Sequence, residues 1–288
     1  KVSNIFCFGY GQVAQGFVNN LSKKNIKFNL SYTSRSIENK NNINSQKIFK
    51  LNENSYDSEI IQEIHNSDFI LISIPPINGN DIVIKHFSEV FKKVKAKCII
   101  YLSATSVYGN HNGKWVTEKS STEPTSENGI NRLEAEKKWI LISEKLSLPI
   151  QIFRLSGIYS NTNNILKRLE AGTARIINKD NHFFSRIHVD DIANIITKSM
   201  THFQSGEIFN ISDDRPASTE EITEYAAGLI NAKIPKKIDL EDLENGMLKN
   251  FYKDSKKVNN EKMKKFFNYN LKFPSYIEGL KHIRDNSF

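Results

Sequence analysis

The stretch Phe6-Cys7-Phe8-Gly9-Tyr10-Gly11-Gln12-Val13-Ala14 decides the fold of this chain. The residues from Asn4 to Phe8 are mostly apolar and have the length of a buried strand. Beyond the glycines the apolar residues recur at the spacing of a helix, at Val13, Ala14, Phe17, Val18 and Leu21. The two glycines therefore lie where a strand turns directly into a helix.

Glycines at such a turn are typical of dinucleotide-binding sites. Gly9 allows the tight turn, Gly11 lets a diphosphate approach the backbone, and Ala14 is small enough for the helix to pack closely on the sheet. The free N–H groups and the positive dipole end of the helix favour phosphate at this place. We predict a dinucleotide held by Gly9, Tyr10, Gly11, Gln12 and Val13. The alternative is a strand–helix turn without a ligand.

Strands and helices alternate along the first 155 residues or so. Further strands are predicted over Phe28–Thr33, Lys47–Leu51, Asp68–Ile74, Cys98–Ser103 and Ile150–Leu155, with a loop over Glu38–Gln46. Helices are predicted over Tyr56–His65 and Asp81–Val94, and from an N-cap at Ser126 through Lys145. This alternation predicts an α/β fold of the Rossmann type, in which a doubly wound parallel sheet has helices on both faces.

Ligands of such sheets bind at the carboxyl ends of the strands. The predicted cofactor site therefore also includes residues from the later strand ends, namely Ser34, Arg35, Ile74, Pro75, Pro76, Ser103, Leu155, Gly157 and Ile158. Beyond Ser160 the pattern changes to a smaller mixed region, with helices predicted from Ile192 and after Ser218. We predict a dinucleotide-binding domain over 1–160, completed by about 185–212, and a substrate-binding region over 161–184 and 213–288.

Composition narrows the possible partners. Of the 288 residues 39% are hydrophobic and 25% are charged, which is ordinary for a soluble protein, and the net charge is +8. The lysines are scattered, so we expect no nucleic-acid partner. Cys7 and Cys98 lie in apolar runs, which predicts buried free thiols in a reducing compartment. Without a metal-ligand cluster, a membrane span or a secretory signal in the sequence, we expect a cytoplasmic protein that binds no metal.

Five segments, in order along the chain, resemble the extended branch of the short-chain dehydrogenase/reductase family, including its atypical members. They are the glycine turn and the segments 101–109, 154–159, 186–193 and 208–214. Members are NAD(P)-dependent epimerases, dehydratases and reductases, often of nucleotide sugars. The resemblance implies an oxidoreductase, epimerase or dehydratase acting on a small molecule, as a monomer or a homodimer.

The end of the second strand bears on the choice of cofactor. NAD binders place Asp or Glu there for the ribose 2′-hydroxyl, whereas NADP binders avoid that charge. Here Ser34-Arg35-Ser36 follows, without an acid until Glu38. Arg35 is suited to a 2′-phosphate, so we predict NADP in preference to NAD.

The catalytic residues that the resemblance implies are replaced. Asn128 and Arg132 stand at the family's Tyr-x-x-x-Lys, and Ala104 stands at its hydroxyl donor. Asn has no ionisable proton, whereas Arg132 can still hold a ribose hydroxyl or a phosphate, and we therefore also include Arg132 in the predicted cofactor site. Substitutes are Thr105 and Ser106 for the hydroxyl, and His111 first for the proton, because histidine titrates near neutral pH.

Other polar residues of the chain have roles that we attribute to structure rather than to catalysis. For Tyr108, Glu118, His188 and Asp190 we favour packing or helix capping over catalysis. Trp115 either forms a wall of the site or staples its loop, and Arg175 and Arg186 bind an anionic group or form surface ion pairs. Two functions stay open: an enzyme with a non-standard proton donor, and a non-catalytic NADP(H)-binding redox sensor or regulatory protein. An RNA-binding or scaffold role has only the net charge in its favour.

Overall fold

The computed structural model describes residues 1–36, 46–244, 246, 249 and 252–288, so most of the predicted loop Glu38–Gln46 lies outside the described residues. Contacts divide the chain into two compact units. Unit 1 contains Lys1–Ala104, Asn131–Arg154 and Ile192–Phe209. Unit 2 contains Thr105–Ile130, Leu155–Asp191 and Asn210–Phe288.

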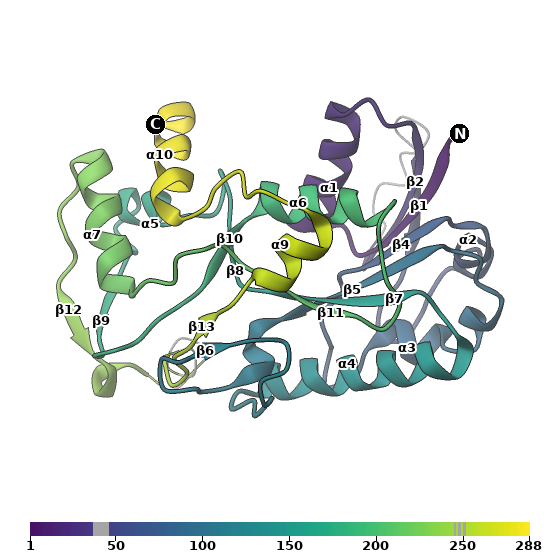
Figure 1. The fold of residues 1–288 in the computed structure, drawn as a ribbon, viewed down its shortest axis with the longest axis horizontal. Helices are drawn as coiled ribbons and strands as arrows, with labels where there is room; N and C mark the ends of the chain where they lie inside the picture. The colour runs from purple at the N-terminus through teal and green to yellow at the C-terminus, as the bar shows by residue number, and fades with distance from the viewer. Residues whose placement is uncertain (37–45, 245, 247–248, 250–251) are drawn as a thin grey trace. The chain divides into compact units, whose positions relative to one another are not determined.

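A seven-stranded sheet with the order β11-β7-β5-β4-β1-β2-β3 is the main element of unit 1 (Figure 1). The pairings from β3 through β5 are parallel. The chain runs outward from β1 to β3 and then returns to the other side of β1 as β4, so the strand order reverses beside β1. This is the predicted Rossmann-type sheet, with strands β1 (Ser3–Phe8), β2 (Phe28–Ser34), β3 (Lys47–Lys50), β4 (Phe69–Ile72), β5 (Cys98–Ala104), β7 (Ile150–Leu155) and β11 (Ile208–Ile211).

Helices cover both faces of this sheet (Figure 1). On one face lie α1 (Gln12–Lys23) and α6 (Val189–Ser199), joined by a 2.8 Å hydrogen bond from Asn20 to Thr197. On the other face lie α3 (Ile82–Phe87), the 3-10 helix η2 (Val90–Lys93) and α4 (Glu127–Leu146), with α2 (Ile60–Asn66) near the sheet edge. The core on the α3–α4 side is aromatic and aliphatic, and its fully buried members include Phe6, Phe8, Ile99, Tyr101 and Trp139.

Three helices differ from the prediction. The helix predicted over Tyr56–His65 begins only at Ile60, because Asp57 is bound to β3 through Lys50: its N–H donates to the Lys50 carbonyl at 2.9 Å and its carboxylate accepts the Lys50 N–H at 2.8 Å. The helix predicted over Asp81–Val94 is divided into α3 and η2. The helix expected from Ile192 begins three residues earlier, at Val189.

Among the residues that the structure describes, unit 2 contains short strands and helices and no second large sheet. Three two-stranded parallel ladders pair β10 with β8, β12 with β9 and β13 with β6. Ser218 caps α7 as predicted, since its hydroxyl accepts the Glu221 N–H at 3.1 Å. The elements are η3 (Thr105–Tyr108), β6 (Trp115–Val116), β8 (Gly157–Tyr159), α5 (Ile165–Glu170), β9 (Ile176–Asn178), β10 (Arg186–His188), α7 (Thr219–Ile230), β12 (Lys237–Asp239), η4 (Leu240–Asp242), β13 (Lys257–Val258), α9 (Glu261–Phe267) and α10 (Tyr276–Ser287).

Both cysteines are free and buried, as predicted, and burial raises the pKa of the Cys7 and Cys98 thiols to about 12. Within the part of the chain that the structure describes, none of the helices has the length and apolar character that a membrane crossing requires.

Candidate functional site

Gly9 is fixed between β2 and β4, immediately after β1. Its φ of +88° is a conformation that side chains disfavour, and a Cβ there would lie 2.9 Å from the Ser73 hydroxyl and 3.1 Å from Ile74 Cγ1. The Gly9 N–H donates to the Thr33 hydroxyl at 2.9 Å, and Ser73 donates to the Phe8 carbonyl at 3.0 Å. The protein itself therefore requires glycine here, and the turn lies at the carboxyl ends of adjacent strands.

Gly11 has a different explanation. Its φ of −85° suits any residue, and a Cβ placed on it would meet no atom of the described residues within 4 Å. It is the N-cap of the twelve-residue helix α1, which has no side-chain cap among the residues that the structure describes. Exposed N–H groups at a helix N-terminus beside an unfilled space fit an anionic group such as a diphosphate. The packing of the described residues therefore gives no reason for glycine at this position.

Tyr10, between the two glycines, stacks on Tyr32 of β2, with ring centroids 4.0 Å apart and an interplanar angle of 14°. Burial raises the pKa of Tyr10 to about 12, since it disfavours the phenolate. The Gln15 side chain donates to the Tyr10 carbonyl at 2.8 Å, and this contact adds to the order of the turn.

The strand ends beside the turn carry the other predicted cofactor residues of unit 1. Ser34 donates to the Ser36 carbonyl at 3.0 Å, and Arg35 is exposed. Ile74 lies next to Gly9, since its Cγ1 would be 3.1 Å from a Cβ placed on Gly9. Pro75 is exposed and Pro76 is half-buried. The structure thus brings Gly9 and Ile74 together, and leaves the Arg35 side chain in solvent.

The Ser103 hydroxyl, near the end of β5, is bound to another side chain inside the protein. It is buried and donates to Glu136 Oε2 at 2.5 Å. Glu136 in turn accepts from Arg154 on β7, with Nη2 2.7 Å from Oε1 and Nε 3.1 Å from Oε2. This buried network was not predicted. Its signal in the sequence is Arg154, a charge inside the apolar run of a central strand, which requires a buried partner.

Arg132 also bonds within unit 1. Its Nη1 donates to the Leu102 carbonyl at 3.0 Å. Its charge lies near the buried Tyr101 and Asp81, and counteracts the effect of burial, which raises the pKa of both groups. Asp81 accepts from the Trp139 indole at 2.9 Å. Asn128, one helical turn before Arg132 on α4, is exposed.

In unit 2 the loop after η3 is held by a hydrogen-bond network. Tyr108 donates to Asn210 Oδ1 at 2.6 Å, and the Asn210 N–H donates to Glu118 at 2.7 Å. His111 Nε2 lies 3.0 Å from the Tyr108 carbonyl and 3.1 Å from the Ser121 carbonyl. Tyr108 and Glu118 therefore have the packing roles that we favoured for them. Thr105 and Ser106 are half-buried in η3.

His188 and Asp190, two further candidate residues of unit 2, form a helix cap and an ion pair. His188 caps α6, because its Nδ1 accepts the Asp190 N–H at 3.0 Å, and Asp190 pairs with Lys272 at 3.0 Å. The expected cap by Asp190 of a helix beginning at Ile192 is therefore wrong, since the helix already includes Asp190.

Arg186 donates to the carbonyls of Phe184 and Ala217, at 3.2 Å each, so it is neither a surface ion pair nor a free guanidinium. Arg175 and Gly157 are exposed, whereas Leu155 is buried and Ile158 half-buried. Trp115 is 54% exposed, and Lys257 lies over its ring.

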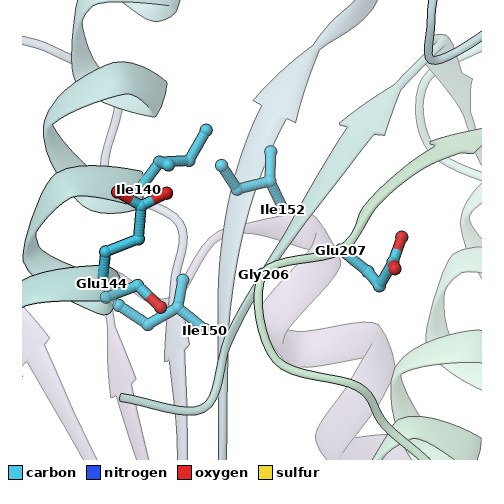
Figure 2. Close-up of a pocket in the computed structure, with 7 residues that line it drawn as sticks. Ile140, Glu144, Ile150, Ile152, Gly206 and Glu207 are labelled. Atoms are coloured by element: carbon cyan, nitrogen blue, oxygen red, sulfur yellow. The ribbon is translucent and has the colours of Figure 1, made fainter. Parts of the chain in front are cut away.

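One pocket lies away from these residues. Figure 2 shows it between α4, β7 and the segment before β11, with apolar walls from Ile140, Ile150 and Ile152 and with Glu144 and Glu207 beside them. Its volume of about 50 Å³ is far below the several hundred Å³ of a nucleotide or sugar-nucleotide site. This pocket is not the candidate site.

Comparison with known proteins is consistent with the strand-end motifs. Residues 82–212 match the model of a family described as the NAD dependent epimerase/dehydratase family. This segment is similar to that family. It includes β5, α4 and β7 and begins after the glycine turn. No curated protein sequence matches the chain.

Solved structures resemble the chain over nearly its whole length. A conserved protein of unknown function from Silicibacter pomeroyi DSS has 28% identity and a TM-score of 0.86, covering 99% of each chain. UDP-glucuronic acid 4-epimerase from Bacillus cereus, in complex with NAD, has 17% identity and a TM-score of 0.77, covering 98% of this chain and 96% of its own. dTDP-glucose 4,6-dehydratase from Bacillus anthracis str. Ames, in complex with NAD, has 16% identity, the same TM-score of 0.77 and the same coverage. The last two likenesses confirm the predicted fold, a Rossmann-type parallel sheet with helices on both faces.

Proposed function

We propose that this epimerase/dehydratase-type chain binds NADP(H) at its glycine turn and uses it in redox chemistry at an alcohol or carbonyl carbon of a small molecule, such as a sugar or a nucleotide sugar. The observation that carries the proposal is Gly11. It stands at a helix N-terminus without a side-chain cap and with open space around it, and none of the described residues requires glycine there.

Within the proposal, each cofactor group has a named partner. The backbone N–H groups at Gly11, Gln12 and Val13 hold the diphosphate, and Ile74 and Pro75 border the turn. The bound cofactor would supply hydride acceptance and donation. Arg35 holds the 2′-phosphate, because an exposed guanidinium at the end of β2, without an acid among Ser31–Ser36, matches that group. NADP is therefore preferred to NAD.

A second candidate function is a redox sensor that binds NADP(H) without turning it over. The observation in its favour is the state of the three replaced residues. Ala104 has no polar side-chain atom, Asn128 has no ionisable proton, and Arg132 donates to the Leu102 carbonyl. The two functions share the cofactor site and differ only in whether a substrate reacts.

Cofactor binding is tested by titrating the purified chain with NADPH and with NADH, alongside the variants Gly11→Ala and Gly228→Ala. Both glycines have open space around them, so neither substitution creates a clash. Gly11→Ala places a methyl group where the diphosphate approaches, and should weaken NADPH binding at least about tenfold. The control lies in α7 of unit 2 and should bind as the wild type does. Equal affinity for all three proteins would contradict the proposed site.

An assay for hydride transfer distinguishes the proposed enzyme from the proposed redox sensor. The chain is incubated with NADPH deuterated at C4 and a panel of carbonyl compounds and nucleotide sugars. Stereospecific transfer of deuterium to any of them supports the enzyme. Tight NADPH binding without transfer to any member of the panel supports the sensor.

A further inference from the structure

The Arg186 guanidinium in unit 2 is held through only one of its nitrogens. Nη1 donates to the carbonyls of Phe184 and Ala217, at 3.2 Å each, and these two bonds use both of its hydrogens. Among the described residues Nε and Nη2 have no hydrogen bond, and Arg186 has no ion pair. The Nε–Nη2 edge is therefore oriented but unused. Arg154 binds the Glu136 carboxylate through this same edge.

Asp213 is a buried carboxyl group with one unused oxygen. It is 1% exposed, and its Oδ1 accepts the Arg215 N–H at 3.0 Å. Its Oδ2 is buried without a hydrogen-bond partner in the described part of the chain. The Asp213 backbone N–H donates to the Arg186 carbonyl at 2.7 Å, so the two residues are neighbours. A buried oxygen without a partner costs free energy, so Oδ2 requires a proton or a donor from a ligand.

The two groups influence each other's charge without forming an ion pair. Burial lowers the pKa of Arg186, and the charge of Asp213 is the largest effect that opposes the shift. Burial raises the pKa of Asp213 well above its ordinary value, and this favours the neutral acid, whose O–H is a donor. The other titratable and charged groups around the pair are Tyr159, Asp191, Asp214, Arg215, Tyr252 and Tyr276.

We propose that the free edge of Arg186 and the Oδ2 hydroxyl of Asp213 bind a carboxylate group of a small molecule. Two parallel N–H groups and one O–H suit a group that only accepts hydrogen bonds. A carboxylate carries one negative charge and balances the charge of Arg186, whereas a phosphate dianion would leave an excess charge in buried surroundings.

Gly157 leaves the stem of Arg186 accessible. Gly157 is exposed, and a Cβ placed on it would lie 4.0 Å from Arg186 Cγ. Gly157, Arg186 and Asp213 all belong to unit 2, so this carboxylate site stands independently of the cofactor turn in unit 1.

The site is tested by NMR of the ¹⁵N-labelled chain without cofactor, in which the Arg186 Nε–H signal is assigned as the one lost in Arg186→Lys. The probes are acetate and sulfate, each compared with chloride at equal ionic strength. We expect a saturable shift of this signal with acetate and a smaller response to sulfate. A shift that does not saturate with acetate would overturn the site, and preferential binding of sulfate would overturn the carboxylate as its ligand.

Asp213→Asn tests the role of the carboxyl group. Asparagine keeps an acceptor for the Arg215 N–H and offers an N–H donor in place of the O–H. In the wild type the affinity for acetate should fall with rising pH, about 10–100-fold in all, as Asp213 loses its proton and the hydrogen bond that it donates. Asp213→Asn should bind acetate at high pH as tightly as the wild type does at low pH. Weaker binding by Asp213→Asn at every pH would contradict this role.

Two further variants distinguish the guanidinium fork from charge alone. Arg186→Lys keeps the charge without the fork, and should weaken acetate binding at least about tenfold, as read from the backbone amide of residue 213. Arg175→Gln removes an exposed positive charge of the same unit and should bind acetate as the wild type does. Equal affinity of Arg186→Lys and the wild type would refute the site. The NADPH titration is a separate measurement, so either proposal can fail without the other.

Discussion

Arg154 on β7 and Glu136 on α4 form a buried two-pronged ion pair, with Nη2 2.7 Å from Oε1 and Nε 3.1 Å from Oε2. Their side chains are 5% and 1% exposed, so neither charge can turn to water if its partner is removed. Ser103 donates a further hydrogen bond to the same carboxylate. The network links β5, α4 and β7 at the strand ends that precede the candidate site.

Arg154→Leu should lower the free energy of unfolding by about 3–5 kcal/mol, because the Glu136 carboxylate is left buried without a counter-charge. Urea denaturation measures the loss. The matched control is Glu134→Gln on the exposed face of α4, where the pair with Lys137 is 3.9 Å long and its loss should cost about 0–1 kcal/mol. Equal losses in the two variants would contradict a special role for the buried pair.

Gly9→Ala should destabilise the fold, in contrast to Gly11→Ala. The positive φ alone costs a side chain about 1–2 kcal/mol. A Cβ would also lie 2.9 Å from the Ser73 hydroxyl, which adds steric repulsion. Combining it with Ser73→Ala should relieve the contact with the hydroxyl and leave the φ cost and the 3.1 Å contact with Ile74 Cγ1, as urea denaturation of the single and double variants would show. A Gly9→Ala protein as stable as the wild type would refute this explanation of the turn.

Arg35→Ala should weaken NADPH binding about 10–100-fold and leave NADH binding unchanged, because only NADPH carries the 2′-phosphate and a hydrogen bond to a charged group contributes about 1.5–3 kcal/mol. Lys93→Ala, also exposed, removes one positive charge elsewhere in unit 1 and serves as the control at equal ionic strength. Equal weakening of both cofactors by Arg35→Ala would show that the arginine does not contact the 2′-phosphate.

Stability should fall as the pH drops from about 6.5 toward 4, in part because of His188. Burial lowers the pKa of His188 to about 4, with Asp190 opposing the shift and Lys272 and His282 adding to it. A histidine in the unfolded chain titrates near 6.5. Between these values the unfolded state binds the additional proton, so the free energy of unfolding decreases with falling pH.

His188→Asn should flatten this pH dependence, since asparagine keeps an acceptor for the Asp190 N–H but does not titrate. Urea denaturation at several pH values, with the exposed His202→Asn as control, measures the slope. Part of the slope will persist, because burial also lowers the pKa of His182 to about 4. A slope equal to that of the wild type in His188→Asn would mean that His188 does not contribute.

The sheet could be predicted because its strands are continuous apolar runs and its first turn carries glycines in order. Ser126 and Ser218 were predictable as helix caps, because a hydroxyl that accepts an N–H three residues on is a local interaction. The start of α6 was predicted wrongly, because the helix expected from Ile192 already begins at Val189, directly after its cap His188.

The long-range contacts of the site could not be predicted from local pattern. Ser103 looked available for a cofactor, but its hydroxyl bonds to Glu136, 33 residues away. The carbonyls that orient His111 come from Tyr108 and Ser121, and only the folded loop brings them to one nitrogen. The residue types in the sequence indicated which side chains were candidates for the site. Only the structure shows which atoms of these side chains form hydrogen bonds, and with which partners.

The central claim is that the turn at Gly11 holds NADP(H). The most direct test is titration of ¹⁵N-labelled protein with NADPH while the backbone amide signals of Gly11, Gln12 and Val13 are followed. The account predicts large, saturable shifts of these amides, with smaller effects at the N-terminus of α7. NADPH and NADH additions that leave all three signals unchanged would contradict it.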